Sequence, residues 1–165
     1  VSGSAGREEF LQRLLQRVER RGEGTEIQVD EALRRRSFEV LLTKKACEHR
    51  TEEDLAALAE IVRRAGDKAE AANAPEIGFT FHHALALASG NPYYPMVMQS
   101  FRPVYVFFYK TACAHSYTQR QFAEQLASIL DAVRRQDPQA AEEIILRIID
   151  NWVREFEKTE KFRRS

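Results

Sequence analysis

The sequence predicts an all-α fold, an antiparallel bundle of six to seven helices. Apolar residues recur at helical spacing in almost every segment, and no run alternates as a half-buried strand does. Helix start and stop signals divide the chain at short intervals, which indicates short connections between antiparallel neighbours. A length of 165 residues fits one domain with a sizeable core.

Three helices are expected in the first part of the chain. A leading helix has an apolar stripe within residues 10–18, and a second helix runs over about 29–47. The third is the most clearly bounded, because Thr51 with Asp54 makes a capping box and Gly66 ends the helix. We expect residues 1–25 to hold a linker or tag plus the leading helix, and residues 26–160 to form the helical domain.

The fourth helix is expected over about residues 72–89. The segment "SGNP" stops it, because Gly90 supplies a left-handed cap and Pro92 starts the next helix. The fifth helix is aromatic along one face, with Pro103 inside it, where the missing backbone donor predicts a kink. The aromatic residues of that face are Phe101, Tyr105, Phe108 and Tyr109.

Two further helices complete the bundle. Thr118 with Gln121 makes a second capping box, which starts the sixth helix. Asp137 caps the seventh helix and Pro138 takes its first position, where a missing backbone donor has no cost.

The composition excludes several classes of protein. Lysine plus arginine number 25 and so do aspartate plus glutamate, which argues against direct nucleic-acid binding by this chain. Cys47 and Cys113 match no zinc or redox spacing and indicate reduced thiols in a cytoplasmic protein. No apolar run reaches the roughly 18 residues of a membrane span. No nucleophile motif or phosphate loop is present, so we do not expect an enzyme.

The histidines in "FHHALALASGNP" are the first candidates for chemistry. His82 and His83 point about 100° apart on a helix, so they cannot easily chelate one ion. No ligand lies three or four residues away, where a helical pair would place it, because Gly78 precedes and aliphatic residues follow. The local pattern therefore favours a ligand-pocket residue or a core histidine at His82 over a metal ligand, and His83 is expected to be the more exposed of the two, as a surface histidine.

Other candidates carry polar groups beside apolar surface. Tyr105, Tyr109 and Trp152 either line a cavity or simply pack in the core, and their polar atoms need partners if they are buried. Arg35, within "RRRSFE", and Arg102 are candidates to meet an anionic group, although arginines in such positions are more often solvated.

Three segments carry a resemblance to a known family. "TEEDLAALAEIVRRA", "FHHALALASGNPYYPMVMQSF" and "ILDAVRRQDPQAAEEIILRII" resemble the C-terminal effector-binding domain, of the FCD type, of FadR-type transcription regulators in the GntR family. The resemblance implies a homodimeric sensor domain. It also implies an N-terminal winged helix-turn-helix that binds operator DNA, and no segment of this chain resembles that module.

The resemblance also implies where a metal would bind. Many members of the family hold a divalent metal with one aspartate and three histidines, and these positions fall on Gly78, His82, Leu126 and Ile148. One histidine among these residues cannot hold zinc or nickel well, so we predict no metal and no other cofactor. Gly78 should cost about 1 kcal/mol relative to alanine in a helix and open space beside His82.

The functional hypothesis is a ligand-sensing regulatory domain. An acyl-CoA, a fatty acid or a small carboxylate would enter between the second, fourth, fifth and seventh helices. It would meet His82, Arg35, Arg102, Tyr105, Tyr109 and Trp152. The alternative is a structural dimerisation bundle without an effector, in which Leu126 and Ile148 have closed the interior.

Overall fold

The computed structural model describes residues 25–115 and 118–164, and these residues form seven α-helices and one 3-10 helix without any strand. In chain order they are α2 (Thr25–His49), α3 (Glu52–Gly66), η1 (Lys68–Asn73), α4 (Ala74–Ala88), α5 (Tyr93–Ser100), α6 (Arg102–His115), α7 (Gln119–Arg134) and α8 (Pro138–Arg164). The all-α prediction is confirmed. The predicted leading helix lies outside the described residues.

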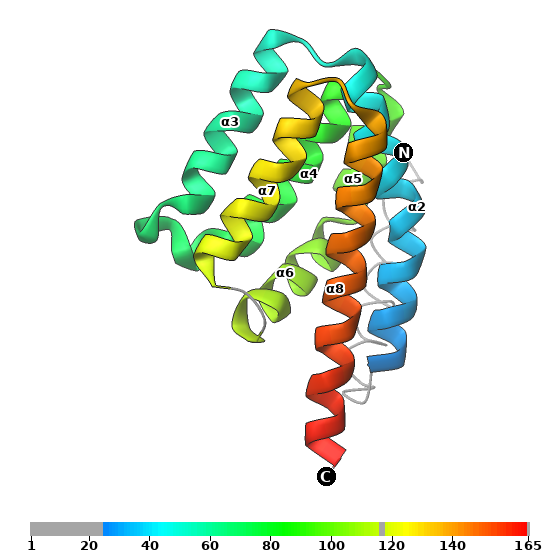
Figure 1. Ribbon diagram of the computed structural model, residues 1–165, viewed down its shortest axis with the longest axis vertical. Helices are drawn as coiled ribbons and strands as arrows, with labels where there is room; N and C mark the ends of the chain where they lie inside the picture. The colour runs from blue at the N-terminus through cyan, green and yellow to red at the C-terminus, as the bar shows by residue number, and fades with distance from the viewer. Residues whose placement is uncertain (1–24, 116–117, 165) are drawn as a thin grey trace, which may run out of the picture.

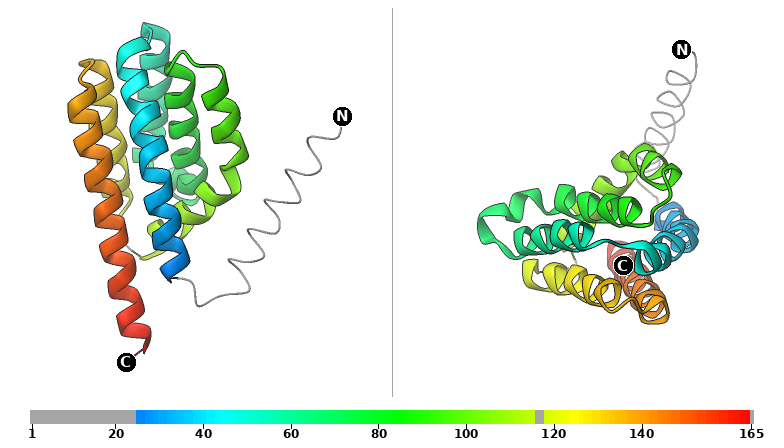
Figure 2. Two further views of the ribbon diagram at one scale, coloured as in Figure 1. Left: turned by 90° about the vertical axis from the view of Figure 1, so that its right-hand side faces the viewer. Right: turned by 90° about the horizontal axis from the view of Figure 1, so that it is seen from above.

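The long helices run up and down the bundle, as the colour sequence in Figure 1 shows. The most extensive pairing is between α2 and α8, which lie side by side, and α8 continues beyond the other helices (Figures 1 and 2). On the other side α3 packs on α7 and on α4. Helix α4 also contacts α2 and α6, and α7 contacts α2 and α8, so both α4 and α7 join the two sides.

Side-chain caps start α3, α7 and α8 where the sequence predicts them. Thr51 Oγ1 accepts a hydrogen bond from the Asp54 N–H at 3.1 Å. Thr118 Oγ1 accepts one from the Gln121 N–H at 3.2 Å. Asp137 Oδ1 accepts one from the Ala140 N–H at 2.9 Å. These bonds satisfy backbone donors that a helix start leaves without partners, and they fix the register of each connection.

The predicted aromatic helix with a kink at Pro103 is wrong: the segment forms two helices, α5 and α6, that break at Phe101. Pro103 is the second residue of α6, not an interior residue. Proline disfavours the helical conformation in the residue before it and cannot donate to a preceding carbonyl. A proline in the first turn of a new helix meets neither problem, and this explains why the break precedes it.

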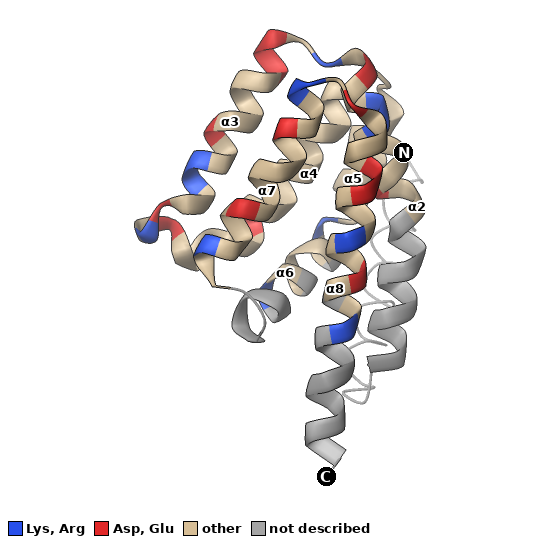
Figure 3. Cartoon of the chain, in the orientation of Figure 1, with Lys and Arg blue, Asp and Glu red and all other residues tan. Residues whose placement is uncertain are grey.

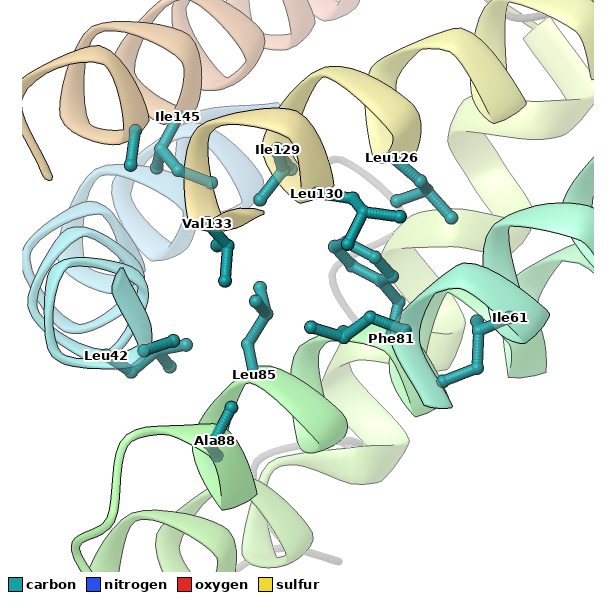
Figure 4. Packing of buried hydrophobic residues seen from close by; sticks show 14 of the residues in the cluster. Leu42, Ile61, Phe81, Leu85, Ala88, Leu126, Ile129, Leu130, Val133 and Ile145 are labelled. Carbon is teal, nitrogen blue, oxygen red and sulfur yellow. The ribbon is translucent and has the colours of Figure 1, made fainter. Parts of the chain in front are cut away.

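The core lies where α4 meets α3 and α7. Leu58 from α3, Phe81 and Leu85 from α4, and Leu126 from α7 are at most 2% exposed. Figure 4 shows these helices presenting aliphatic side chains around Phe81. Helical periodicity predicted these positions, because each belongs to an apolar stripe on its helix.

Two connections use left-handed backbone. Gly90 has φ +72° and ends α4, as predicted. Gln136 has φ +52° at the end of α7, where the Asp137 N–H donates to the Ala132 carbonyl. This bond closes a helix end of the Schellman type, which favours glycine at that position.

The surface carries charges of both signs. Figure 3 shows acidic and basic residues interspersed along α3, α7 and α8. Such mixing agrees with the equal totals of acidic and basic residues in the sequence. Among the described residues, no helix is long and apolar enough to cross a membrane.

Candidate functional site

His82 lies inside the bundle, on the face of α4 that α6 covers. Its side chain is 3% exposed, and its Nε2 is 2.6 Å from the hydroxyl oxygen of Tyr109 on α6. Histidine is seldom this deeply buried unless its polar atoms have partners. The tyrosine hydroxyl can donate to Nε2 or accept from it, depending on the tautomer of the ring.

Aromatic rings surround this hydrogen bond. The ring centre of His82 lies 5.5 Å from that of Tyr105 and 5.9 Å from that of Tyr109. Phe122 of α7 meets the Tyr109 ring edge-on at 5.7 Å. We call His82, Tyr105, Tyr109 and Phe122 the aromatic cluster. Tyr105 and Tyr109 follow the helical period of α6, which brings both rings to the same side of that helix.

Gly78 lies one turn before His82 on α4, and Tyr109 packs directly against it. A Cβ atom added at Gly78 would be 2.8 Å from three atoms of the Tyr109 ring. Real Cβ contacts are not this short, so any side chain at residue 78 would displace that ring. The expectation that Gly78 leaves open space beside His82 is therefore wrong: the Tyr109 ring fills that space.

Arg102 is not part of the aromatic cluster. Its guanidinium donates to the carboxylate of Glu76 at 2.6 Å and lies 5.7 Å from the ring centre of Phe79. Both side chains of the ion pair are nearly half exposed. Arg102 thus links the start of α6 to α4 at the surface, while Phe79 contacts Tyr105 beneath it.

Arg35 lies on α2 and Trp152 on α8, the two helices that pack along each other. Their side chains are outside the described part of the structure. Their roles as effector ligands stay predictions.

His83 is half-buried and thus more exposed than His82, as expected. Its ring centre is 5.9 Å from that of Phe79, and burial lowers the pKa of its imidazole below the ordinary value. It lies next to the apolar surface of α4, not with His82.

The four positions that the family resemblance assigns to a metal do not form a donor set that fits one. Gly78 has no side chain, Leu126 is 2% exposed among apolar neighbours, and Ile148 packs against the core. The remaining histidine already bonds Tyr109 through Nε2. Within residues 25–115 and 118–164, no group of three or more histidine, cysteine, aspartate or glutamate side chains could hold a metal ion.

Sequence reasoning gave no site role to two buried residues, Phe122 and Glu39. Phe122 is the first buried residue of α7 and was assigned only to its apolar stripe. Glu39 on α2 is 4% exposed, and a buried carboxylate is unusual. Glu39 lies three and four residues before the buried Leu42 and Thr43 on α2, and its spacing of four from Arg35 was the signal in the sequence that pointed to it.

The comparison with protein families identifies the class. The model of the FCD domain matches residues 31–151, most of the chain, and this protein belongs to that family. The match confirms the resemblance found in the sequence, an effector-binding domain of the FCD type in the GntR family. It covers α4, α6 and α7 and therefore the whole aromatic cluster.

A solved structure supports the fold. The chain is similar to the GntR protein of Streptococcus agalactiae, with a TM-score of 0.62 and 19% sequence identity. The alignment covers 79% of this chain and 60% of that protein, so this chain spans less than two thirds of its length. No curated protein matches the chain.

Proposed function

We propose that the chain is the ligand-sensing regulatory domain of a bacterial transcription factor of the GntR family and FadR type. It acts in the cytoplasm, and it is not an enzyme. The observation that carries the proposal is the pair of His82 and Tyr109, polar groups joined at 2.6 Å inside an otherwise apolar bundle. Buried polar groups in aromatic surroundings are the usual means by which a protein orients a small ligand.

The proposed effector is a small anion or a fatty acyl compound. Apolar and aromatic side chains around His82 suit an acyl chain, and an imidazole can bond one polar atom of its head group. Arg35 is the proposed partner of an anionic head group. Arg102 would have to leave Glu76 to take that part. We propose that no metal takes part. The lack of a metal-ligating side chain at Gly78, Leu126 and Ile148 supports this.

The proposed response is a shift in helix packing. Tyr105 and Tyr109 both lie on α6, which is separated from α5 by the break at Phe101. An effector that bonds His82 in place of Tyr109 would favour a different position of α6 on α4. The effector can shift the equilibrium between the two positions of α6 only by the difference in its binding free energy for them. A DNA-binding module outside this chain would receive the change.

We further propose that the domain works as a homodimer. Apolar side chains are exposed at the end of α4 and along α5: Leu87, Tyr93, Met96 and Val97. No charged residue lies between His83 and Arg102 in the sequence. In a two-fold contact each residue near the axis meets its own copy, so an uncharged face avoids repulsion between like charges. An apolar patch of this kind is typical of a protein interface.

A thermal-shift titration tests effector binding. Palmitate, palmitoyl-coenzyme A and citrate represent the three proposed classes. A true effector at about 100 times its dissociation constant should stabilise the domain by about 2.7 kcal/mol, which is readily seen as a rise in Tm. The Tyr109→Phe variant should change the response, and Tyr93→Phe, at an exposed tyrosine, is the matched control. If none of the three probes raises Tm, the structural alternative gains support.

The alternative is a dimerisation bundle without an effector. Its specific support is the position of Tyr109, whose ring fills the space above Gly78. Leu126 on α7 is buried as well, at 2% exposed, and Phe122 of the same helix packs on the Tyr109 ring. Under this hypothesis the dimer forms, the probes do not bind, and substitutions at His82 change only stability.

A further inference from the structure

The pair of Gly78 and Tyr109 has geometry that plain core packing does not require. Gly78 is buried in the middle of α4, where glycine is a poor helix former. The nearest atoms to a Cβ at that position are the Cγ, Cδ2 and Cε2 atoms of Tyr109. These atoms form the rigid part of the ring, so they cannot move aside without the whole side chain.

The Tyr109 ring is also fixed from other directions. Phe122 meets it edge-on at 5.7 Å, and the His82 ring lies beside it at 5.9 Å with 35° between the planes. The hydroxyl at the end of the ring is 2.6 Å from His82 Nε2. A ring held by Gly78, Phe122 and a short hydrogen bond has little freedom to accept a side chain at residue 78.

We propose that Gly78 and Tyr109 are a coupled pair that determines what the site can bind. The missing side chain at Gly78 admits the Tyr109 ring, and the Tyr109 hydroxyl occupies the position on His82 Nε2 that a bound ligand would otherwise take. Tyr109 is thus an internal occupant of the site. It acts through His82 as a positioning residue, and it selects against any ligand that needs this nitrogen as a metal-coordinating donor.

This inference deepens the proposed function and rests on it in one respect. If the domain senses an effector through His82, the effector must either displace the Tyr109 hydroxyl or bond to it. Compounds that offer a hydrogen-bonding oxygen, such as a carboxylate or thioester carbonyl, can take the place of the hydroxyl. Tyr109 therefore favours oxygen-bearing organic effectors over metal chelates.

A double-mutant cycle without any ligand tests the coupling. Gly78→Ala should lower Tm by roughly 3 to 10 °C, because the added Cβ overpacks against the ring. Removing the ring first, with Tyr109→Ala, should reverse the sign. In that background Gly78→Ala should raise Tm, because alanine is the better helix former and nothing obstructs its Cβ. If Tyr109→Ala does not fold, Tyr109→Leu keeps apolar volume without a ring and serves the same purpose.

Gly66 supplies the matched control. It is also a helical glycine, but its added Cβ would be 3.9 Å from the Ala123 Cβ, an ordinary contact. Gly66→Ala should leave Tm unchanged or raise it in both backgrounds. Equal losses from Gly78→Ala with and without the Tyr109 ring would overturn the coupling, and so would the absence of any loss.

A titration with zinc chloride tests the occupancy of His82. The wild-type protein and the His82→Gln variant should bind zinc equally, because no zinc ion depends on His82. In a separate NMR measurement, the chemical shift of the His82 Nε2 nitrogen should differ between wild type and Tyr109→Phe. One tightly held zinc ion per chain that depends on His82 would contradict the proposal. Because the cycle uses no effector, failure of the effector screen leaves the coupling intact. Conversely, if the Tm changes of Gly78→Ala and the Tyr109 substitution simply add while a probe raises Tm, the coupling is rejected and the proposed function stands.

Discussion

The α3–α7 pair and the α4–α6 pair differ in what holds them together. Helices α3 and α7 both start with complete capping boxes and bury mainly aliphatic stripes. Helix α4 has no side-chain capping bond from its cap residue Asn73, contains Gly78 in its interior and buries His82. The contrast agrees with the proposal that the α4–α6 pair holds the effector site. Deviations from good local design concentrate at sites that serve a function.

The largest expected effect lies in the α3–α7 pair. Leu58 is fully buried on α3, and Leu58→Ala should lower the free energy of unfolding by about 2 to 5 kcal/mol, because it removes apolar contacts and leaves a cavity. Urea denaturation measures the change. Glu53→Ala, at an exposed position on the same helix, should stay within about 0.5 kcal/mol of wild type. A loss at Leu58 as small as the loss at Glu53 would break the comparison.

The next effect lies in the α4–α6 pair. Tyr109→Phe removes the hydroxyl and leaves a polar atom of the buried His82 without that bond, which should lower stability by about 1 to 3 kcal/mol. Tyr93→Phe, at a tyrosine that is 71% exposed, controls for the loss of a hydroxyl as such. Chemical denaturation of both variants decides the matter. A neutral Tyr109→Phe would mean that the bond to His82 contributes little to folding.

The helix caps sharpen the comparison directly. Thr118→Ala removes the capping bond of α7 and should cost about 1 kcal/mol. Asn73→Ala, at the cap position of α4, should cost less, because the Asn73 side chain makes no capping bond and the substitution removes only an exposed hydrogen bond to Glu70. Similar costs at both positions would show that the two helix pairs do not differ in this respect.

The smallest effect belongs to the junction between the two regions. The carboxylate of Glu70 in η1 accepts a hydrogen bond from Arg64 of α3. Mainly because of this bond, the pKa of the Glu70 carboxyl falls from 4.5 to about 2. The native state therefore binds this proton less tightly than the unfolded chain. The resulting stabilisation is complete above pH 4.5 and is lost as the pH falls toward 2. An NMR titration of the carboxyl carbon should give a midpoint near 2 in wild type and a higher one in Arg64→Met. A wild-type midpoint near 4.5 would contradict the ion pair.

The parts of the fold that local chemistry controls were predictable from the sequence. Thr51, Thr118 and Asp137 were assigned as caps because capping depends on residues within one turn. The break at Phe101 was missed, because Pro103 is compatible both with a kink inside one helix and with the first turn of a second. Only the packing of α6 on α4 decides between these two outcomes.

The candidate site was predictable in part. His82, Tyr105 and Tyr109 were selected as polar groups on apolar faces, and the structure brings these three together. Their pairing joins residues on two different helices, and periodicity within one helix cannot show it. Gly78 was noticed for its missing side chain, but a sequence does not show which neighbour enters the space. Arg102 was selected for its charge, but at the surface it forms an ion pair with Glu76 of α4.

Native mass spectrometry of the purified protein, with no ligand or metal added, tests the central claim most directly. The claim is that His82 and Tyr109 form a metal-free site for an organic effector in a dimeric domain. It predicts a dimer mass that carries a few hundred daltons of organic material or, in a second measurement with the thermal-shift probes added, a dimer that gains the mass of one of them. A dimer that holds a metal ion through His82, or one that binds none of the probes, would contradict it.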